Sequence, residues 1–221
     1  MPEAYRLGAD QFTVVIMERL QAMPCYAFEG ICPVVHPTSF LHPTASLIGD
    51  VIVGPGCYIG AGASLRGDFG RIVVEGDSSI QDNCTLHSGS GSDCVIGRGA
   101  TIGHGSIVHG AAVGENALVG MNAVILDEAI IGAECLVGAL SLVKSDMRAP
   151  ARSLIAGNPA KVVRTMPTEN IIWKNDGEGE YQRLARQSLF DFIECEPLPE
   201  PEPDRRRMSS VARAVRLTSK E

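Results

Sequence analysis

The sequence of 221 residues has few aromatic residues and no long hydrophobic run. Only 5% of its residues are aromatic, whereas Gly (24) and Pro (13) are numerous. No apolar stretch approaches the roughly 20 residues that a membrane-spanning helix needs. A hydrophobic content of 45% excludes wholesale disorder. Few aromatics and many turn-forming residues favour a core of small repeated layers over a helix-packed domain.

The sequence also lacks an excess of positive charge, and it lacks closely paired cysteines. The net charge of −7 argues against a general nucleic-acid-binding protein. The seven cysteines are an odd number without a CxxC pair, which disfavours both a disulfide framework and a cysteine zinc site. The first residues do not show the basic and apolar regions of a secretory signal. We therefore expect a cytoplasmic protein that does not enter a membrane.

Aliphatic residues recur every six positions through the middle of the chain. The sixteen positions are Leu47, Val53, Ile59, Leu65, Val74, Ile80, Leu86, Ile96, Ile102, Val108, Val113, Val119, Ile125, Ile131, Val137 and Val143. A helix requires a period near 3.6 and an alternating strand a period of 2, so neither explains the pattern. A period of six predicts an all-β solenoid with three short strands per coil, the aliphatic residues pointing inward and Gly relieving crowding behind them.

The repeat count predicts about five coils, stacked about 4.8 Å apart. Extra residues between Leu65 and Val74, and between Leu86 and Ile96, predict corner loops. We divide the chain into an N-terminal extension (1–22), a β-helix domain (23–165), a helical segment (166–195) and a flexible tail (196–221). Met23 is an alternative start. The spacing of apolar residues from Tyr181 to Ile193 indicates a helix, and 168–175 is a second helical candidate.

Coil arithmetic brings two histidines together. His87 follows the inward Leu86 and His109 follows the inward Val108, one full coil later. The two histidines should therefore stack on one outward face, with Arg66 in the same column. The same count aligns Asp82 with His104 and Gln81 with Gly103 on another side.

A catalytic zinc site needs about three neutral imidazoles and an open fourth position. His87 and His109 can supply two ligands, and a neighbouring copy could deliver His104, which makes a cyclic homotrimer the natural interpretation. The alternative is that the three are solvated surface histidines. His36 and His42 each precede Pro in the lead-in, where a structural or exposed role is expected.

The motifs LRGDFG (65–70), IQDNCTLH (80–87) and IGHGSIVHG (102–110) resemble those of the gamma-class carbonic anhydrase-like hexapeptide-repeat proteins. That resemblance implies a left-handed parallel β-helix with a C-terminal α-helix, assembled as a trimer. The lead-in from Tyr26, the segments ALVGMNAVILD (117–127) and AGNPAKVVR (156–164), and the ending look closer to one subgroup. This subgroup contains phenylacetic acid degradation proteins (PaaY) and carnitine operon proteins (CaiE).

Carried over by motif, the resemblance implies metal ligands at His87, His104 and His109, with the middle one from a neighbouring subunit. The metal would be zinc, or another divalent ion such as iron or cobalt. Arg66 and Asp68 match a pair that joins subunits near the site, and Gln81 matches the residue that orients the hydroxide or the substrate.

Three positions depart from the pattern of the fast anhydrases. The loop SGSGSDCV (88–95) is short and has only Asp93 as an acid, Phe69 replaces a second acid, and Ser79 replaces an Asn. These departures put efficient carbon dioxide hydration in doubt, because that reaction must export a proton.

The subgroup resemblance implies a metal-dependent thioesterase that hydrolyses aberrant acyl-CoA thioesters of phenylacetate breakdown. Three alternatives stay open: a gamma-class carbonic anhydrase acting on carbon dioxide and bicarbonate, a hexapeptide-repeat acyltransferase, and a non-enzymatic accessory protein of carnitine metabolism. Cys84 and Cys94 lie near the site in sequence, but no base is paired with either, so we interpret them as packing residues.

Overall fold

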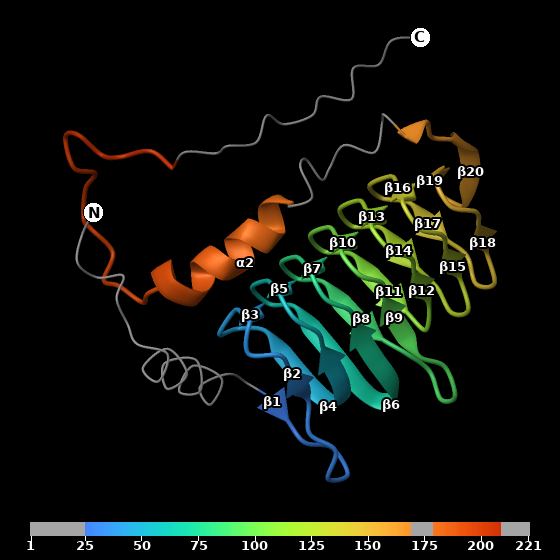
Figure 1. Cartoon of the computed structure of the whole chain (residues 1–221), viewed down its shortest axis with the longest axis horizontal. Coiled ribbons are helices and arrows are strands. Elements are labelled where there is room, and N and C mark those ends of the chain that lie inside the picture. The colour runs from blue at the N-terminus through green and yellow to red at the C-terminus, as the bar shows by residue number, and fades with distance from the viewer. Residues whose placement is uncertain (1–24, 169–178, 209–221) are drawn as a thin grey trace.

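The computed structural model describes residues 25–168 and 179–208, and in these residues the chain winds into a stack of short parallel strands. Figure 1 shows the successive turns lying side by side from the blue end to the yellow end, with a helix alongside. Each complete turn contributes one strand to each of three faces. The predicted all-β solenoid with a C-terminal helix is therefore confirmed.

The three faces are distinguished by the strands that pair along them. The first face contains β1 (Cys25–Tyr26), β4 (Ser46–Val53), β6 (Ser64–Val74), β8 (Thr85–His87), β11 (Ile107–His109), β14 (Val124–Ile125) and β17 (Leu142–Val143). The second contains β2 (Val34–Val35), the distal halves of β4 and β6, then β9 (Cys94–Ile96), β12 (Ala112–Val113), β15 (Ile130–Ile131) and β18 (Arg148–Ala149). The third contains β3 (Phe40–Leu41), β5 (Tyr58–Ile59), β7 (Ser79–Ile80), β10 (Thr101–Ile102), β13 (Leu118–Val119), β16 (Leu136–Val137), β19 (Ser153–Gly157) and the antiparallel β20 (Ala160–Thr165).

The solenoid has more turns than the sequence count predicts. Seven parallel strands, β3 to β19, lie along the third face, one for each turn. The prediction of about five coils is wrong because the repeat continues beyond both ends of the aliphatic series. Leu41 at the first end, and Ala149 and Ile155 at the second, occupy further inward positions and are buried.

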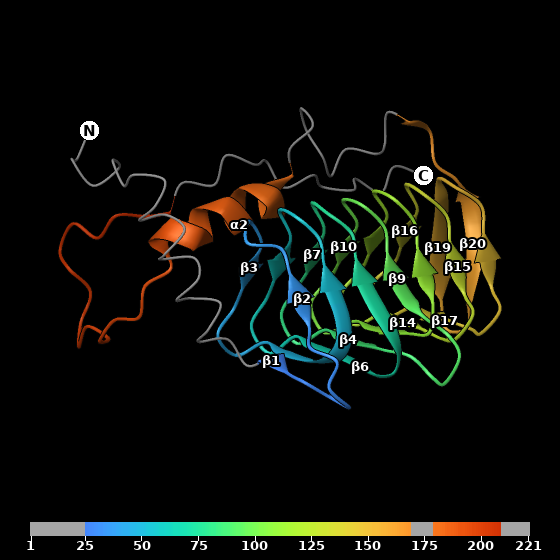
Figure 2. The ribbon, with the colours of Figure 1, turned by 60° about the horizontal axis from the view of Figure 1, so that its bottom comes forward.

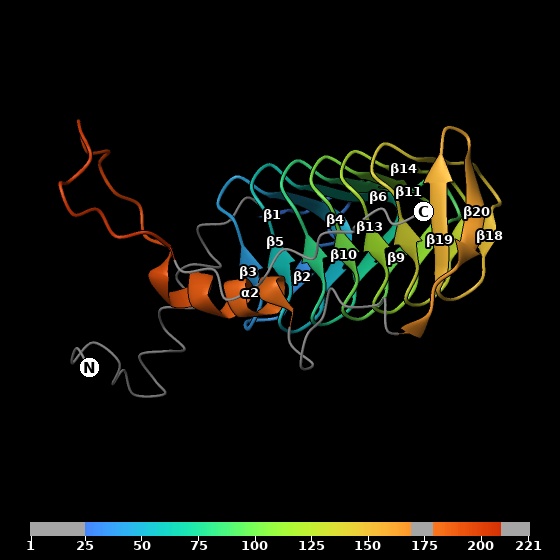
Figure 3. The same cartoon turned by 90° about the horizontal axis from the view of Figure 1, so that it is seen from above.

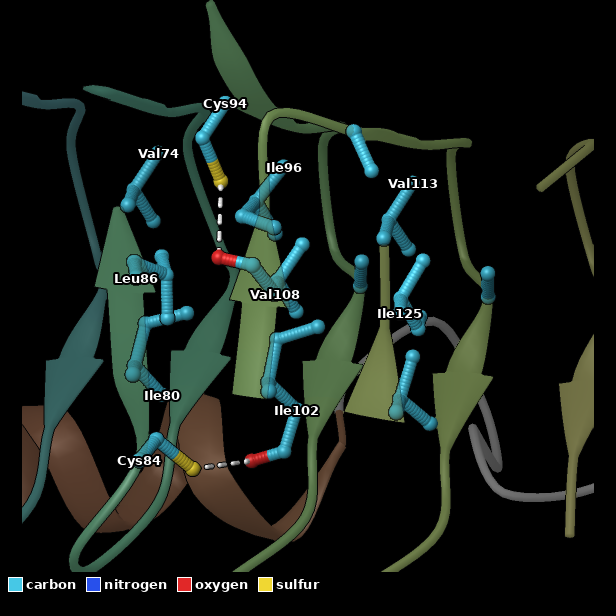
Figure 4. Close-up of a cluster of buried hydrophobic side chains, with 14 of the residues drawn as sticks. Val74, Ile80, Cys84, Leu86, Cys94, Ile96, Ile102, Val108, Val113 and Ile125 are labelled. Carbon is cyan, nitrogen blue, oxygen red and sulfur yellow. Dashed lines mark hydrogen bonds between the residues drawn. The ribbon is translucent and has the colours of Figure 1, made fainter. Parts of the chain in front are cut away.

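The inward aliphatic side chains form one continuous core. All sixteen predicted positions are at most 2% exposed. Figure 4 shows the columns that these side chains make between the strands. Burying an aliphatic side chain of this size stabilises a fold by about 1.5–3 kcal/mol, so the columns are a main source of stability.

Small residues occupy the position two before each inward residue. Ala117, Cys84 and Ser106 are representative, and all three are buried. The thiol of Cys84 donates to the carbonyl oxygens of Ile102 and Gly103, and the hydroxyl of Ser106 donates to the carbonyl of Gly120 (Figure 4 draws the contact from Cys84 to Ile102). Only a small side chain fits here between the core and the backbone of the following turn.

Corner geometry explains two classes of residue. One corner position per repeat has positive φ, and Asn83, Asn116 and Asn122 occupy it with φ between 54° and 57°. Asn tolerates this left-handed conformation better than most residues. The Gly after an inward residue has another cause: a Cβ on Gly97 would lie 2.8 Å from the amide nitrogen of Glu115 in the next turn. The predicted crowding is thus confirmed as an approach of neighbouring turns.

Helix α2 (Glu180–Asp191) lies along the third face, over β3 and β5. Figure 2 and Figure 3 show it beside the first turns of the solenoid rather than at its end. Tyr181 contacts the ring of Tyr58, and Phe192, just after the helix, contacts Phe40 and His42. These contacts bring the C-terminal segment back to the beginning of the β-helix.

The helix confirms the apolar spacing predicted from Tyr181, although Ile193 is 73% exposed and lies beyond its end. The last strand, β20, ends at Thr165. Residues 196–208 are exposed and form no helix or strand. The N-terminal extension and residues 169–175 of the second helical candidate lie outside the described residues.

Candidate metal site

Arg66, His87 and His109 lie in one column on the first face. The register of β6, β8 and β11 pairs Arg66 with His87 and His87 with His109. The column arises because each residue directly follows an inward Leu or Val and therefore points outward. The predicted stack is confirmed, with the two imidazole centroids 5.0 Å apart.

The two stacked imidazoles point one nitrogen at each other. His87 Nδ1 lies 3.1 Å from His109 Nε2. His87 is buried, with an 8% exposed fraction, whereas the His109 side chain is one-third exposed. The pair is therefore open to solvent on the His109 side.

Each ring has an aspartate on its other nitrogen. His87 Nε2 lies 3.0 Å from Asp68 Oδ1, and His109 Nδ1 lies 2.7 Å from Asp127 Oδ1. A carboxylate accepts a hydrogen bond from a ring nitrogen that carries a proton. Each aspartate therefore favours the tautomer in which the nitrogen facing the other imidazole keeps its lone pair. Two lone pairs at 3.1 Å repel unless a cation or a proton lies between them.

Asp68 is held as a carboxylate by its neighbours. Arg66 donates to its Oδ2 at 2.6 Å within the same subunit. That this pair joins subunits stays a prediction. Partial burial opposes the ionisation of Asp68, but the hydrogen bonds from Arg66 and His87 and the charge of Arg66 outweigh it, and the pKa of Asp68 lies below its usual value. Asp68 thus stays anionic and can keep accepting from His87.

His104 lies in the turn that follows β10 of the third face, in a separate cluster. Its Nδ1 is 3.3 Å from Asp82 Oδ2, which confirms the predicted alignment of Asp82 with His104. Its Nε2 is 3.3 Å from the hydroxyl of Tyr181 on helix α2. Its backbone N–H donates to Gln81 Oε1 at 3.2 Å, and Gln81 is only 6% exposed.

Within one subunit, no three His, Cys, Asp or Glu side chains of residues 25–168 and 179–208 are grouped so that they could hold a metal ion. The structure brings His87 and His109 together and leaves His104 apart from them. A three-histidine site would therefore need His104 from another copy of the chain.

Two residues of these clusters are missing from the sequence prediction. Asp127 lies one turn beyond His109, and coil arithmetic could have found it, because it follows the inward Ile125 by two positions. The sequence predicts Tyr181 only as part of a helical pattern. Its contact with His104 spans 77 residues, and the repeat carries no signal of where the helix docks.

Several other predictions concern residues around the site. Cys84 and Cys94 are buried, and burial raises their thiol pKa values to about 11 and about 12, so the prediction of packing roles is confirmed. The thiol of Cys94 donates to the carbonyl oxygen of Val108. Phe69 is 61% exposed and contacts the His87 ring. Ser79 Oγ is buried without a hydrogen-bond partner among the described residues.

His36 and His42 have structural roles, as predicted. Each begins a His-Pro-Thr sequence, and each Nδ1 accepts from the hydroxyl or the backbone N–H of its Thr, Thr38 and Thr44 respectively. The two histidines occupy equivalent positions in consecutive repeats.

The donor chemistry of the His87–His109 pair fits a divalent transition metal. Zinc prefers imidazole nitrogen at about 2.0–2.1 Å, and two such ligands in a tetrahedral site lie about 3.3 Å apart. The observed separation of 3.1 Å is close to that value. A carboxylate on the second ring nitrogen is the usual support for a metal-ligating histidine. His87 and His109 each hydrogen-bond to one, and His104 has Asp82 within ion-pair distance at 3.3 Å.

Together, the six-residue repeat, the parallel stacked turns and the C-terminal helix define a hexapeptide-repeat protein of the left-handed parallel β-helix class. A solved hexapeptide transferase family protein from Anaplasma phagocytophilum is 35% identical with a TM-score of 0.66, and the match covers 75% of this chain and 94% of that one. A mutant of AntD, an N-acyltransferase from Bacillus cereus, is 16% identical with a TM-score of 0.55 over 70% of this chain and 91% of that one, and it shares the fold.

Sequence comparison gives a narrower assignment. The carnitine operon protein CaiE of Escherichia coli (strain K12 / DH10B) is 48% identical over 189 residues, which cover 86% of this chain and 96% of the relative. CaiE of Proteus sp. (strain LE138) is 47% identical over 186 residues, covering 84% and 94%. No protein-family model matches the chain. The chain belongs to the CaiE family.

Among the described residues, no helix is both long and apolar enough to cross a membrane.

Proposed function

We propose that this protein is a metal-dependent hydrolase of acyl-CoA thioesters that acts as a cytoplasmic homotrimer. The observation that supports the proposal is the pairing of each candidate ligand with an aspartate: His87 with Asp68, His109 with Asp127 and His104 with Asp82. A solvated surface histidine does not need such a partner, and three in one protein favour a metal site. The proposed metal is zinc, with iron or cobalt as alternatives.

The corner that carries His104 supports subunit contact at this place. Asn122 donates its N–H to the carbonyl of His104, and Leu140 donates to that of Met121, so the corner continues through two further turns. Met121 and Leu140 are 57% and 72% exposed. Large apolar side chains exposed in a row are typical of a protein–protein contact. We propose that this corner meets the first face of a neighbouring subunit.

In the proposed reaction, water cleaves the thioester into a carboxylic acid and the CoA thiol. A metal held by three imidazoles lowers the pKa of water to about 7 and polarises a carbonyl group. Gln81 uses its carbonyl oxygen on the His104 N–H, so its amide N–H groups remain to orient the attacking oxygen or the thioester carbonyl. Asp68 holds His87, and Arg66 in turn holds the Asp68 carboxylate.

A slow hydrolase fits the surroundings better than a fast anhydrase. Asp93, the one acid of the loop 88–95, accepts the backbone N–H of Arg71 at 3.2 Å. This structural role supports the view that the loop does not relay protons. Clearing aberrant CoA adducts needs only modest turnover, at which buffer can carry the proton.

The second candidate function is acyl transfer, because one solved relative at 35% identity is described as a hexapeptide transferase family protein. Acyltransferases of this architecture typically use one histidine as a base, whereas this chain has three histidine–aspartate pairs. An accessory role in carnitine metabolism rests on the names of the CaiE relatives.

The test is a comparison of reactions on one preparation. The metal-loaded wild type should hydrolyse aromatic or ring-opened acyl-CoA thioesters, the activity should vanish on chelation, and Gln81→Ala should lower it at least tenfold. Cys84→Ala is the matched control and should retain activity. Rapid, buffer-independent carbon dioxide hydration without thioesterase activity would instead identify an anhydrase, and acyl transfer to an amine or hydroxyl acceptor that survives chelation would identify a transferase.

A further inference from the structure

The corner that carries Asp127 is fixed by the turns on both sides of it. Glu128 donates its N–H to the carbonyl of Gly110 at 2.7 Å, and Asp146 donates to the carbonyl of Asp127 at 3.0 Å. The Asp127 carboxylate is therefore placed by the ladder of backbone hydrogen bonds and does not depend on a flexible loop.

Gly110 leaves the space that the carboxylate uses. A Cβ at this position would lie 2.7 Å from Asp127 Oδ1, and Gly110 has a φ of +54°, which side chains rarely adopt. A side chain here would move the carboxylate away from His109. Backbone and sequence thus both keep Asp127 Oδ1 at 2.7 Å from His109 Nδ1.

The stability of the fold does not explain this arrangement. The side chains of His109 and Asp127 are 33% and 45% exposed. Exposed pairs of this kind usually contribute only about 0–1 kcal/mol to stability. The contact does, however, determine which ring nitrogen carries the proton, and the nitrogen that it leaves free faces His87.

We propose that Asp127 is a positioning residue that holds His109 in the Nδ1–H tautomer and so presents its Nε2 to a divalent metal. The metal part of this inference rests on the proposed function, whereas the tautomer part concerns only residues in the structure. Mutating a carboxylate that supports a metal-ligating histidine typically weakens metal binding 10- to 100-fold.

The first experiment measures the tautomer without metal. Long-range ¹H–¹⁵N spectra of the histidine rings are recorded on chelator-treated wild type, Asp127→Asn and Asp146→Asn near pH 8. His109→Gln assigns the signals. Wild type and Asp146→Asn should show the Nδ1–H form of His109. Asp127→Asn should lose it or show a mixture, because a neutral amide can also donate to Nδ1. An unchanged tautomer in Asp127→Asn would overturn the proposal.

The second experiment measures Co²⁺ affinity by competition with a chelator, following the visible absorption of bound cobalt. Asp127→Asn should bind about 10- to 100-fold more weakly, Asp127→Glu should recover part of the loss, and Asp146→Asn should match wild type. A changed tautomer with unchanged affinity would overturn the positioning role. If the wild type itself binds no divalent metal, the proposed function fails, and the tautomer result still decides what Asp127 does to His109.

Discussion

The cysteines of this protein differ sharply in their surroundings. Cys57, Cys84, Cys94 and Cys135 each lie two positions before an inward residue and are buried, whereas Cys25, Cys32 and Cys195 are exposed. Burial raises the pKa of Cys57 and Cys84 to about 11 and that of Cys94 to about 12. Because the thiolate is the reactive form, the buried group should be chemically silent in the folded protein.

This difference predicts the number of reactive thiols. At pH 8, an aromatic disulfide reagent should react with the three exposed thiols, more slowly with Cys25 because partial burial raises its pKa too, and with all seven only after unfolding. Raising the pH to 9 should speed the fast group and leave the buried group unreactive. Fast reaction of Cys84 or Cys94, identified by mass spectrometry, would show that the corner opens on that timescale.

The sequence is sufficient to predict which residues stack along the repeat, but it does not predict how their side chains are oriented. A count of hexads put His87 above His109 and Asp82 beside His104, because stacking is fixed by the backbone register. The orientation of each imidazole depends on which carboxylate reaches it. Tyr181 comes from a helix that obeys no repeat.

The turns between strands show how each repeat depends on local conformation. Asn116 occupies a corner position with positive φ, and Glu134 occupies the equivalent position one turn later, with a φ of +56°. A residue other than Gly, Asn or Asp in this conformation costs roughly 1–2 kcal/mol in the general case. The later turns therefore carry strain that the earlier turns avoid.

Replacing Glu134 should relieve that strain. Glu134→Asn is expected to raise the free energy of unfolding by about 0.5–1 kcal/mol, because Asn tolerates a positive φ. Glu115→Asn is the matched control: Glu115 lies in the preceding corner, does not have positive φ, and should show no gain. Urea unfolding at fixed protein concentration measures both. A loss of stability in Glu134→Asn would mean that the Glu side chain makes a contact worth more than the strain.

The elements were predictable where the repeat is strong. Aliphatic residues at sixteen inward positions identify the strands, but the small Ala149 interrupts the aliphatic series, so the series does not predict the turn that contains Ile155. The antiparallel strand β20 was also not predicted, because it leaves the six-residue period altogether.

For the whole molecule, the main consequence is the separation of the three histidines. His87 and His109 face each other on the first face, while His104 lies with Asp82 and Tyr181. If the proposed site forms between subunits, each subunit contributes two ligands to one site and one ligand to another. In such a closed ring of subunits, every His87–His109 pair faces one His104 from a neighbouring subunit.

Mixing two defective variants tests this arrangement. His104→Ala and His87→Ala should each lose metal binding, since one missing ligand leaves two histidines at every site. After the two are unfolded together in equal amounts and refolded, random trimers should regain about one quarter of the wild-type sites, because an intact pair then meets an intact His104 at that frequency. Metal content by mass spectrometry and thioesterase activity should rise together. Variants mixed without unfolding serve as the control and should stay inactive. No recovery, with hybrid trimers verified by native mass spectrometry, would show that the three histidines do not form a shared site and would remove the interface from the mechanism.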